Sequence, residues 1–487
     1  MAKEAFHGPL ERINDTSWRI PKSYRAGMRV DGIVYADDAL IESIRDDQAL
    51  EQVANVAFLP GIQSASLAMP DIHWGYGFCI GGVCATDPAE GGVISPGGVG
   101  YDINCGVRLV RSNLFRGDVR PFQTQLVEEL FRRVPTGTGR GGKYRFSPAE
   151  LRRLMDEGVA YLLGRGLAVE SDLEHTEARG RLDNAQPDSV SDRALERGHD
   201  QCGTLGSGNH FLEVQVVDAI FDAAAARSMG LEKDMVCVMI HSGSRGLGYQ
   251  VCDDALRSLR KAPEKYGIDL PDRQLVCAPV DSPEGREYIG AMSAAANFAW
   301  CNRQLLMWQA RECFETIFGR SWQELGMNLI YDVAHNIAKF EEHTIGRASK
   351  RVWVHRKGAT RAFPPGHAET PAAYRQIGQP VIIPGDMGRA SWVLVGQQGS
   401  MDQTFGTACH GAGRLMSRTA AVKHAQGRRI DQELAAKGVV ARARSYKGLA
   451  EEQPAAYKNV DLVVEVVHRA GLAKKVARLC PIGVIKG

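Results

Sequence analysis

The chain has 487 residues, a formal net charge of +2 and 44% hydrophobic residues, so it can bury a large core and carries no overall positive field that would attract nucleic acid. Its 11 cysteines stand singly, with no C-x-x-C pair, which argues against a disulfide framework and a zinc knuckle. The N-terminal residues lack an apolar signal core, and no apolar run approaches the roughly 20 residues of a membrane span. We therefore expect a cytoplasmic protein without membrane association.

Hydrophobic periodicity, taken in chain order, predicts the elements of the first part of the chain. Apolar residues at helical spacing predict three helices, which cover 39–53, 121–134 and 147–163. Residues 65–73 are typical of a strand that leads into a loop, and the Gly/aromatic run that follows passes into a second strand. Residues 165–200 are mostly polar and charged without a clear period, so we interpret them as a long exposed connection.

The second half of the chain repeats one design, in which an apolar strand ends in polar residues and a Gly-rich loop. Such units occur at 235–248, 328–339, 351–361 and 380–391, whereas at 201–214 a Gly/Ser loop delivers Asn209 and His210 at the start of a strand. The longest helical pattern spans 283–318, with Ser282 as its N-cap and Pro283 in its first turn. Because we find no internal repeat and no low-complexity linker, we expect one large α+β domain over residues 1–487.

A Gly-rich loop at 95–108, S-P-G-G-V-G-Y-D-I-N-C-G-V-R, carries one carboxylate, Asp102, and one thiol, Cys105. Glycine lets the backbone approach a ligand closely, so this loop can present a hard and a soft ligand to one metal ion. The alternative is an ordinary Gly-rich turn that contains a buried cysteine. Further candidate ligands elsewhere in the chain favour the metal site.

These further candidates are histidines at strand ends, each close to Gly, Ser or Asn. With the loop residues, the candidate metal ligands are Asp102, Cys105, His210, His241 and His335. One thiolate, three imidazoles and one carboxylate exceed a single tetrahedral site, but two ions bridged by Cys105 would use all five and could support phosphoryl transfer. Taken singly, each histidine could instead be a hydrogen-bonded core residue, and Cys105 a small buried hydrophobic side chain.

Exposed backbone N–H groups beside these residues predict a phosphate-binding site. They occur in S-G-N-H (207–210), P-G-D-M-G (384–388) and H-G-A-G (410–413), and we expect the last to lie at a helix N-terminus, whose dipole favours anions. A nucleophile there would attack a phosphorus atom held by the metal and these amides, and His410 is the candidate. The basic Gly loop T-G-T-G-R-G-G-K at 136–143 is a weaker phosphate candidate.

Several long segments, in order from about residue 60 to the end, carry a family resemblance. They are G-Y-D-I-N-C-G-V-R, L-G-S-G-N-H-F-L-E, H-S-G-S-R-G-L-G, Y-D-V-A-H-N, H-R-K-G-A-T, P-G-D-M-G, C-H-G-A-G-R and P-I-G-V-I-K-G. With them the chain resembles the RtcB family of RNA-splicing ligases, which join an RNA 3′-phosphate or 2′,3′-cyclic phosphate to a 5′-hydroxyl. The resemblance implies an α+β fold with mixed and antiparallel sheets around a central metal cleft.

The resemblance also implies roles for individual residues. Asp102, Cys105 and His210 would hold one manganese ion, and Cys105, His241 and His335 the second. His410 would take GMP from GTP, GMP would pass to the RNA 3′-phosphate, and the 5′-hydroxyl would displace it; a cyclic phosphate end is first opened. Contacts to the guanylate would come from Asn209, His210, Phe211, Leu212, Glu213, His335, Asn336, Pro384, Gly385, Asp386, Met387, Ser391, His410, Gly411, Ala412, Gly413 and Lys486. The reaction would serve tRNA splicing or RNA repair, with archease as a possible partner.

Basic residues near these motifs are candidates to steer the RNA. We expect Arg356, Lys357 and Arg361 to do so, with Arg140, Lys143 and Arg245 as weaker candidates, although the short basic run could also be an ordinary solvated surface. One departure from the family pattern is Asp386, where Ser or Thr is expected.

Two other functions therefore stay open. A two-metal phosphoesterase that acts on RNA ends without a nucleotide is one, although His410 and Lys486 argue against it. A catalytically inactive relative that binds nucleotide or RNA ends is the other, and Asp386 is its only sequence hint.

Overall fold

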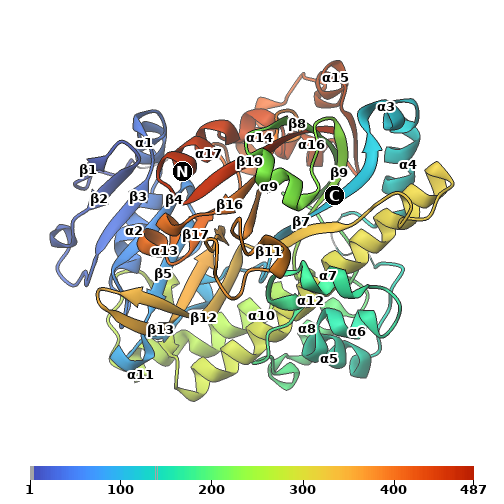
Figure 1. Ribbon diagram of the computed structural model, residues 1–487. Helices are drawn as coiled ribbons and strands as arrows, with labels where there is room; N and C mark the ends of the chain where they lie inside the picture. The colour runs from blue at the N-terminus through green and yellow to red at the C-terminus, as the bar shows by residue number, and fades with distance from the viewer. Residues whose placement is uncertain (1–4, 138, 140) are drawn as a thin grey trace.

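The computed structural model describes residues 5–137, 139 and 141–487. Two large sheets form its framework (Figure 1). The seven-stranded sheet has the order β1 (Glu11–Asn14), β2 (Ser17–Ile20), β3 (Asp31–Tyr35), β4 (Ala65–His73), β5 (Ile80–Thr86), β13 (Ala348–Lys357) and β12 (Asn336–Ile345). Apolar side chains of this sheet form one core cluster with side chains of helices that lie near the N-terminus and near the C-terminus of the chain.

The eight-stranded sheet follows the order β11 (Leu329–Ala334), β7 (Gly106–Phe115), β9 (Met235–Ser242), β8 (Phe211–Ile220), β19 (Ala473–Lys486), β16 (Ser391–Gly396) and β15 (Pro380–Ile383), and β18 (Val440–Ala443) pairs with β19. Two small sheets pair β6 (Val93–Ile94) with β10 (Ala278–Pro279) and β14 (Ala359–Arg361) with β17 (Thr407–Cys409). Among the described strands, β3–β4 and β18–β19 pair in parallel and the other named pairs are antiparallel.

Helices cover these sheets and connect their strands. They are α1 (Asp38–Arg45), α2 (Ala49–Val56), α3 (Arg116–Val119), α4 (Gln123–Arg133), α5 (Pro148–Glu157), α6 (Val159–Leu163), α7 (Glu170–Glu174), α8 (Asp192–Gly198), α9 (Ala223–Met229), α10 (Arg245–Ser258), α11 (Ala262–Lys265), α12 (Pro283–Phe318), α13 (Gln398–Thr404), α14 (Arg418–His424), α15 (Ile430–Ala436), α16 (Tyr446–Glu451) and α17 (Val460–Arg469). Helices and mixed sheets in one chain confirm the expected α+β class. None of the helices in the described residues is long and apolar enough to cross a membrane.

The long helix α12 confirms the prediction over 283–318. The Ser282 hydroxyl accepts a hydrogen bond from the Gly285 N–H at 3.0 Å, and Pro283 occupies the first turn. The helix runs from the lower part of the molecule to its right-hand edge in Figure 1 and packs against α5 and α10, and most of its side chains are buried. A helix buried in this way must pair its charged residues internally, and Arg303 is one of them.

Three expectations need correction. Residues 39–53 and 147–163 each form two helices rather than one, and in the second case Gly158, with φ of 61°, separates α5 from α6. Residues 165–200 are not an exposed connection, because they contain α7 and α8 and bury two carboxylates, Asp172 and Glu177.

Those two carboxylates explain why the segment was misread. Asp172 pairs with Arg311 at 2.8 Å, and Glu177 pairs with Lys339 at 2.6 Å. Charges normally indicate surface, but here they are the buried counter-ions of cations on α12 and β12. Whether the chain is one domain stays a prediction.

Candidate active site

The five candidate metal ligands meet because of the strand order in the eight-stranded sheet. Four of them lie at the ends of the adjacent strands β11, β7, β9 and β8: His335 follows β11, Cys105 precedes β7, His241 is near the end of β9 and His210 precedes β8. These neighbours are antiparallel, so the end of one strand lies beside the start of the next. His241 is accordingly in register with Val107 on one side and Phe211 on the other.

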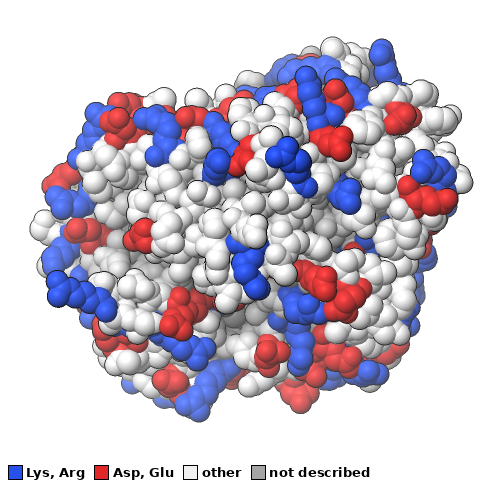
Figure 2. Space-filling model, viewed as in Figure 1, with Lys and Arg blue, Asp and Glu red and all other residues white. Residues whose placement is uncertain are grey.

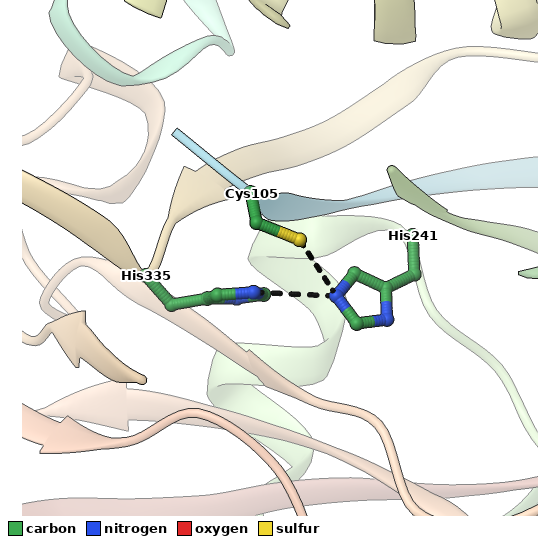
Figure 3. Close-up of side chains that lie close together, drawn as sticks. All are labelled: Cys105, His241 and His335. Atoms are coloured by element: carbon green, nitrogen blue, oxygen red, sulfur yellow. Dashed lines mark hydrogen bonds between the residues drawn. The ribbon is translucent and has the colours of Figure 1, made fainter. Parts of the chain in front are cut away.

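The ligand atoms lie close together. Cys105 Sγ is 3.4 Å from His210 Nε2. It is also 3.3 Å from His241 Nε2, which in turn is 3.2 Å from His335 Nε2 (Figure 3). Asp102 Oδ2 is 2.8 Å from His210 Nε2. The atoms form two groups, Cys105 with His241 and His335, and Cys105 with Asp102 and His210, each within 4.8 Å. Cys105 belongs to both groups, as a bridging ligand would.

Burial prepares these side chains to bind a cation. It lowers the pKa of His241 and of His335 well below the ordinary value, so both imidazoles are neutral ligands. Burial also raises the pKa of the Cys105 thiol, with the Asp102 charge adding to this, so the thiolate form requires a nearby positive ion. Burial alone would raise the pKa of Asp102, but His210 outweighs it and lowers that pKa. A buried set of nitrogen, sulfur and oxygen donors fits a borderline divalent ion.

A buried ion-pair network beneath the ligands fixes their backbone. Asp332 on β11 pairs with Arg303 and with Arg108, each at 2.8 Å, and all three side chains are fully buried. Arg303 also donates to the carbonyl oxygen of Asn104 at 2.7 Å and to that of Ser242 at 2.9 Å. Because Asn104 and Ser242 are the direct neighbours of Cys105 and His241, the guanidinium of Arg303 ties together the strands that carry both ligands.

His410 comes from the other side of the cleft. It follows β17, and its ring centroid lies 4.8 Å from that of His335. Its Nδ1 is 2.5 Å from Asp71 Oδ2, and the same oxygen accepts hydrogen bonds from the His410 and Gly411 N–H groups at 3.1 and 3.2 Å. Burial alone would raise the pKa of Asp71, but the interaction with His410 lowers it, so the carboxylate is ionised. We infer that Nδ1 carries a proton and that Nε2 presents its lone pair.

Asp71 is a site residue that the sequence patterns did not identify. It lies in β4, where the pairing with β5 is irregular between Ala68 and His73. The available signal was a carboxylate inside the apolar strand A-S-L-A-M-P-D-I-H, because an unpaired buried charge is costly and requires a partner.

The H-G-A-G turn does not lie at a helix N-terminus, contrary to expectation. Helix α14 begins only at Arg418, with Ser417 as its N-cap. Two of the amides expected to bind phosphate are bonded to Asp71 instead. The turn packs directly on β4: Gly413 has φ of 75°, and a Cβ there would collide with the carbonyl oxygen of Asp71. The glycines therefore position the ring of His410.

The ligands and His410 line one cleft of about 670 Å³. Of the residues expected to contact guanylate, those that line it are Asn209, His210, Phe211, Glu213, His335, Asn336, Pro384, Gly385, Asp386, Met387, His410, Gly411, Ala412, Gly413 and Lys486. Leu212 does not, because side chains alternate along β8 and Leu212 packs in the core while Phe211 and Glu213 face the cleft. Ser391 supports the cleft from behind, with its hydroxyl accepting from the Gly385 N–H at 3.3 Å.

Charged side chains gather at the end of the cleft where guanylate contacts were expected. We call it the nucleotide end and define it by Glu213, Asp386, Glu452 and Lys486. Burial raises the pKa of Glu213 to about 7 and lowers the pKa of Lys486. Lys486 Nζ donates to the Gly208 carbonyl at 3.2 Å and lies 3.5 Å from Glu452. Burial also raises the pKa of Asp386, whose carboxylate pairs with Arg389 at 3.3 Å.

The expected RNA-steering residues are placed differently. Arg356 and Arg361 are buried, and they pair with Glu341 at 2.7 Å and Glu369 at 2.6 Å, so the prediction that they steer RNA is wrong. A short basic run in a strand indicated surface, but its side chains point into a buried charge network. Arg140 lies outside the described residues.

The other basic candidates are accessible to different degrees. Lys357 lines the cleft, Lys143 pairs with Glu312 at 3.0 Å, and the Arg245 guanidinium is 3.3 Å from His210 Nδ1. Arg197, Arg414 and Arg418, which the sequence did not single out, also line the cleft. On the face shown in Figure 2, Lys and Arg alternate with Asp and Glu and form no single basic surface.

Fold and site together define a protein with a buried Cys/His/Asp cluster that can hold metal, set beside a histidine in a cleft between two sheets. The family model described as tRNA-splicing ligase RtcB matches residues 52–487, and the chain belongs to that family. Proteins named tRNA-splicing ligase RtcB from Thermococcus kodakarensis and Archaeoglobus fulgidus are each 55% identical to it, over 98% and 99% of this chain and 99% of theirs. The one from Methanococcus maripaludis is 52% identical over 98% of this chain and 99% of its own.

Proposed function

We propose that this protein is a GTP- and manganese-dependent RNA ligase that joins 3′-phosphate or 2′,3′-cyclic phosphate ends to 5′-hydroxyl ends, in cytoplasmic tRNA splicing or RNA repair. The observation that carries the proposal is the position of His410. Its ring is oriented by Asp71 and lies against the ligand cluster through His335, in a cleft that also contains Lys486 and Glu213. Family membership supports the same reaction.

The first step uses the free nitrogen of His410. Nε2 attacks the α-phosphorus of GTP, a P–N bond forms, and the bond to the β-phosphate oxygen breaks as pyrophosphate leaves with the electron pair. The imidazole becomes positively charged, and the Asp71 carboxylate at Nδ1 stabilises that charge and keeps the proton in place. Asp71 therefore acts as a positioning residue for this step.

Two further transfers complete the reaction. An oxygen of the RNA 3′-phosphate attacks the GMP phosphorus, the P–N bond breaks, and its electron pair returns to Nε2. The 5′-hydroxyl oxygen then attacks the RNA 3′-phosphorus, loses its proton, and GMP leaves. At a cyclic end, water first attacks the phosphorus, the P–O2′ bond breaks and the 2′-oxygen takes a proton. Activation with GMP is needed because a phosphate monoester has no good leaving group.

Two manganese ions would be held by the five ligands, one by Asp102, Cys105 and His210 and the other by Cys105, His241 and His335. Bound there, they would supply charge stabilisation to the phosphate oxygens. The nucleotide end of the cleft supports the choice of GTP, because guanine presents two neighbouring donors, N1–H and the 2-amino group, to which the Glu213 carboxylate is complementary.

The test is incubation of the protein with manganese and GTP labelled at the α-phosphate. We expect an acid-labile covalent label that is lost in His410→Ala, and ligation of RNA with 3′-phosphate and 5′-hydroxyl ends by the wild type. RNA-end processing without any label would instead establish the two-metal phosphoesterase. Nucleotide or RNA-end binding without label or processing would establish the inactive relative. Repeating the assay with added archease tests whether turnover depends on that partner.

A further inference from the structure

A cluster of three tyrosines and an arginine forms part of the cleft wall. The rings of Tyr101 and Tyr249 are stacked, with centroids 4.7 Å apart and an interplanar angle of 26°. Tyr76 meets Tyr101 edge-on at 5.8 Å. The Arg197 guanidinium carbon lies 5.3 Å from the centroid of Tyr249. All four residues line the cleft that contains His410, and none of them takes part in the mechanism above.

Tyr249 is exposed, whereas its neighbours in α10, Gly248 and Gln250, are buried. It is 48% exposed and, among the exposed large hydrophobic side chains of the described residues, it is the one that lines this cleft. Tyr101 and Tyr76 behind it are half-buried. A tyrosine that serves only the core would be covered, so the open ring of Tyr249 indicates a surface that receives another flat group.

The stack is held at a fixed place relative to the reacting centre. Tyr101 directly precedes Asp102, a candidate metal ligand, and Tyr249 lies in the first turns of α10, which begins at Arg245. Lys357 Nζ donates to the Tyr76 carbonyl oxygen at 2.5 Å and so holds the backbone that carries the third ring. The rings therefore lie beside the metal-ligand cluster, on segments of the chain other than those that carry Glu213, Asp386 and Lys486.

Aromatic rings and guanidinium planes are the groups on which unstacked nucleobases stack in protein–RNA complexes. We propose that Tyr249, backed by Tyr101 and flanked by Arg197, is a stacking platform for a nucleobase close to one of the two RNA ends. The inference rests on the proposed function, because a phosphate that reaches His410 brings its neighbouring bases into the same cleft. Every base has a flat face, so the platform would bind RNA ends of varied sequence, and Arg197 offers a positive charge to the adjacent phosphate.

The experiment uses the full chain with manganese, labelled with GMP before RNA is added. Transfer of GMP to an oligonucleotide with a 3′-phosphate is followed over a range of RNA concentrations and normalised to the label in each preparation. Tyr249→Ala is expected to raise the RNA concentration for half-maximal rate by about 5- to 100-fold, with a much smaller change in the rate at saturation. Tyr249→Phe and Tyr249→Trp should restore half-saturation to within about threefold of wild type.

Phe221→Ala is the matched control. Phe221 is 54% exposed and packs on another aromatic ring, Trp392, but it lies beyond the end of β8 that is remote from His210. Its removal should leave half-saturation by RNA unchanged. An equal effect of Phe221→Ala and Tyr249→Ala would show that loss of any exposed ring weakens the protein generally, and would overturn the platform.

Abasic nucleotides identify the end that is bound. They are placed one at a time at the first three positions from the 3′-phosphate and, in ligation assays, from the 5′-hydroxyl. At one position the abasic RNA should weaken wild type but not weaken Tyr249→Ala any further. If the two losses multiply at every position, no base stacks on Tyr249 and the inference is wrong. Absence of label in wild type would refute the proposed function instead, and direct RNA binding by fluorescence anisotropy would still test the platform.

Discussion

The metal-ligand cluster and the nucleotide end of the same cleft are built in different ways. Four of the five metal ligands stand at the ends of adjacent strands of one sheet, where backbone hydrogen bonds set their separation. The nucleotide end is assembled from separate segments, such as the loop at 384–387 and Lys486 at the end of β19, joined by contacts such as Ser391 to Gly385. Changes near the cluster should therefore affect metal binding and stability together, whereas changes at the nucleotide end should affect ligand affinity alone.

The largest effect is expected at the shared thiol. Because Cys105 belongs to both ligand groups, Cys105→Ala should abolish binding of both manganese ions, whereas Asp102→Ala and His335→Ala should each abolish one. Metal content after gel filtration, measured by elemental mass spectrometry, gives the stoichiometry. Cys480→Ala, which removes a thiol outside both groups, is the control. One ion retained by Cys105→Ala would contradict a bridging role.

The next effect concerns the orientation of His410. Asp71→Asn keeps the size of the side chain but removes the charge that holds the proton on Nδ1, so the rate of self-labelling by GTP should fall by about 10²- to 10⁴-fold. Rapid-quench measurement of the label gives this rate. Manganese stoichiometry should be unchanged, which separates loss of orientation from loss of metal. A rate within threefold of wild type would show that the turn alone orients the ring.

Stability provides the third contrast. Asp332→Ala leaves two buried guanidinium groups without their carboxylate, so the free energy of unfolding should fall by about 3–5 kcal/mol. The comparison is Asp218→Ala, which breaks an exposed pair with Arg478 and should cost less than about 1 kcal/mol. Urea unfolding followed by circular dichroism measures both. Equal losses would mean that the network beneath the ligands does not support the sheet edge.

The smallest effect is a pH dependence at the nucleotide end. Glu213 has a pKa of about 7, so it is protonated below pH 7 and ionised above it, and only the ionised form accepts both guanine donors. Guanosine, which carries no phosphate to titrate, should bind up to about tenfold more weakly for each pH unit below 7. Glu213→Gln should bind with little change over the same range. Calorimetry checks both, and an unaltered slope in the variant would assign the titration to Lys486 or Asp386.

The metal-ligand cluster could be predicted from the sequence more fully than the nucleotide end of the cleft. The strand–loop junctions at His210, His241 and His335 carry local patterns, and the family resemblance implied that the three histidines meet at one metal centre although the strand order was unknown. Leu212 was expected at the cleft because the run from Asn209 to Glu213 was carried over together, and strand alternation turns it into the core. Ser391 was carried over singly and lies behind the cleft wall, bonded to Gly385.

Buried charge was the main source of error. Charged residues usually lie at the surface, but four of them are buried here because they pair with residues far away in the chain: Asp71, Asp172, Arg356 and Arg361. For example, Asp71 and His410 are 339 positions apart. A pattern within a few residues holds no information about such a pairing. It can indicate that a charged residue is unusual in an apolar segment, but it cannot identify the residue with which that charge pairs.

One short junction has a mechanical consequence. Strand β11 belongs to the eight-stranded sheet and β12 to the seven-stranded sheet, and His335 is the single residue between them. A tilt of one sheet against the other would bend the chain at this residue and would shift its imidazole relative to Cys105 or His410. The amount of bound metal would then depend on the angle between the two sheets. Distant substitutions that loosen the packing between the sheets would be detected as a loss of bound metal.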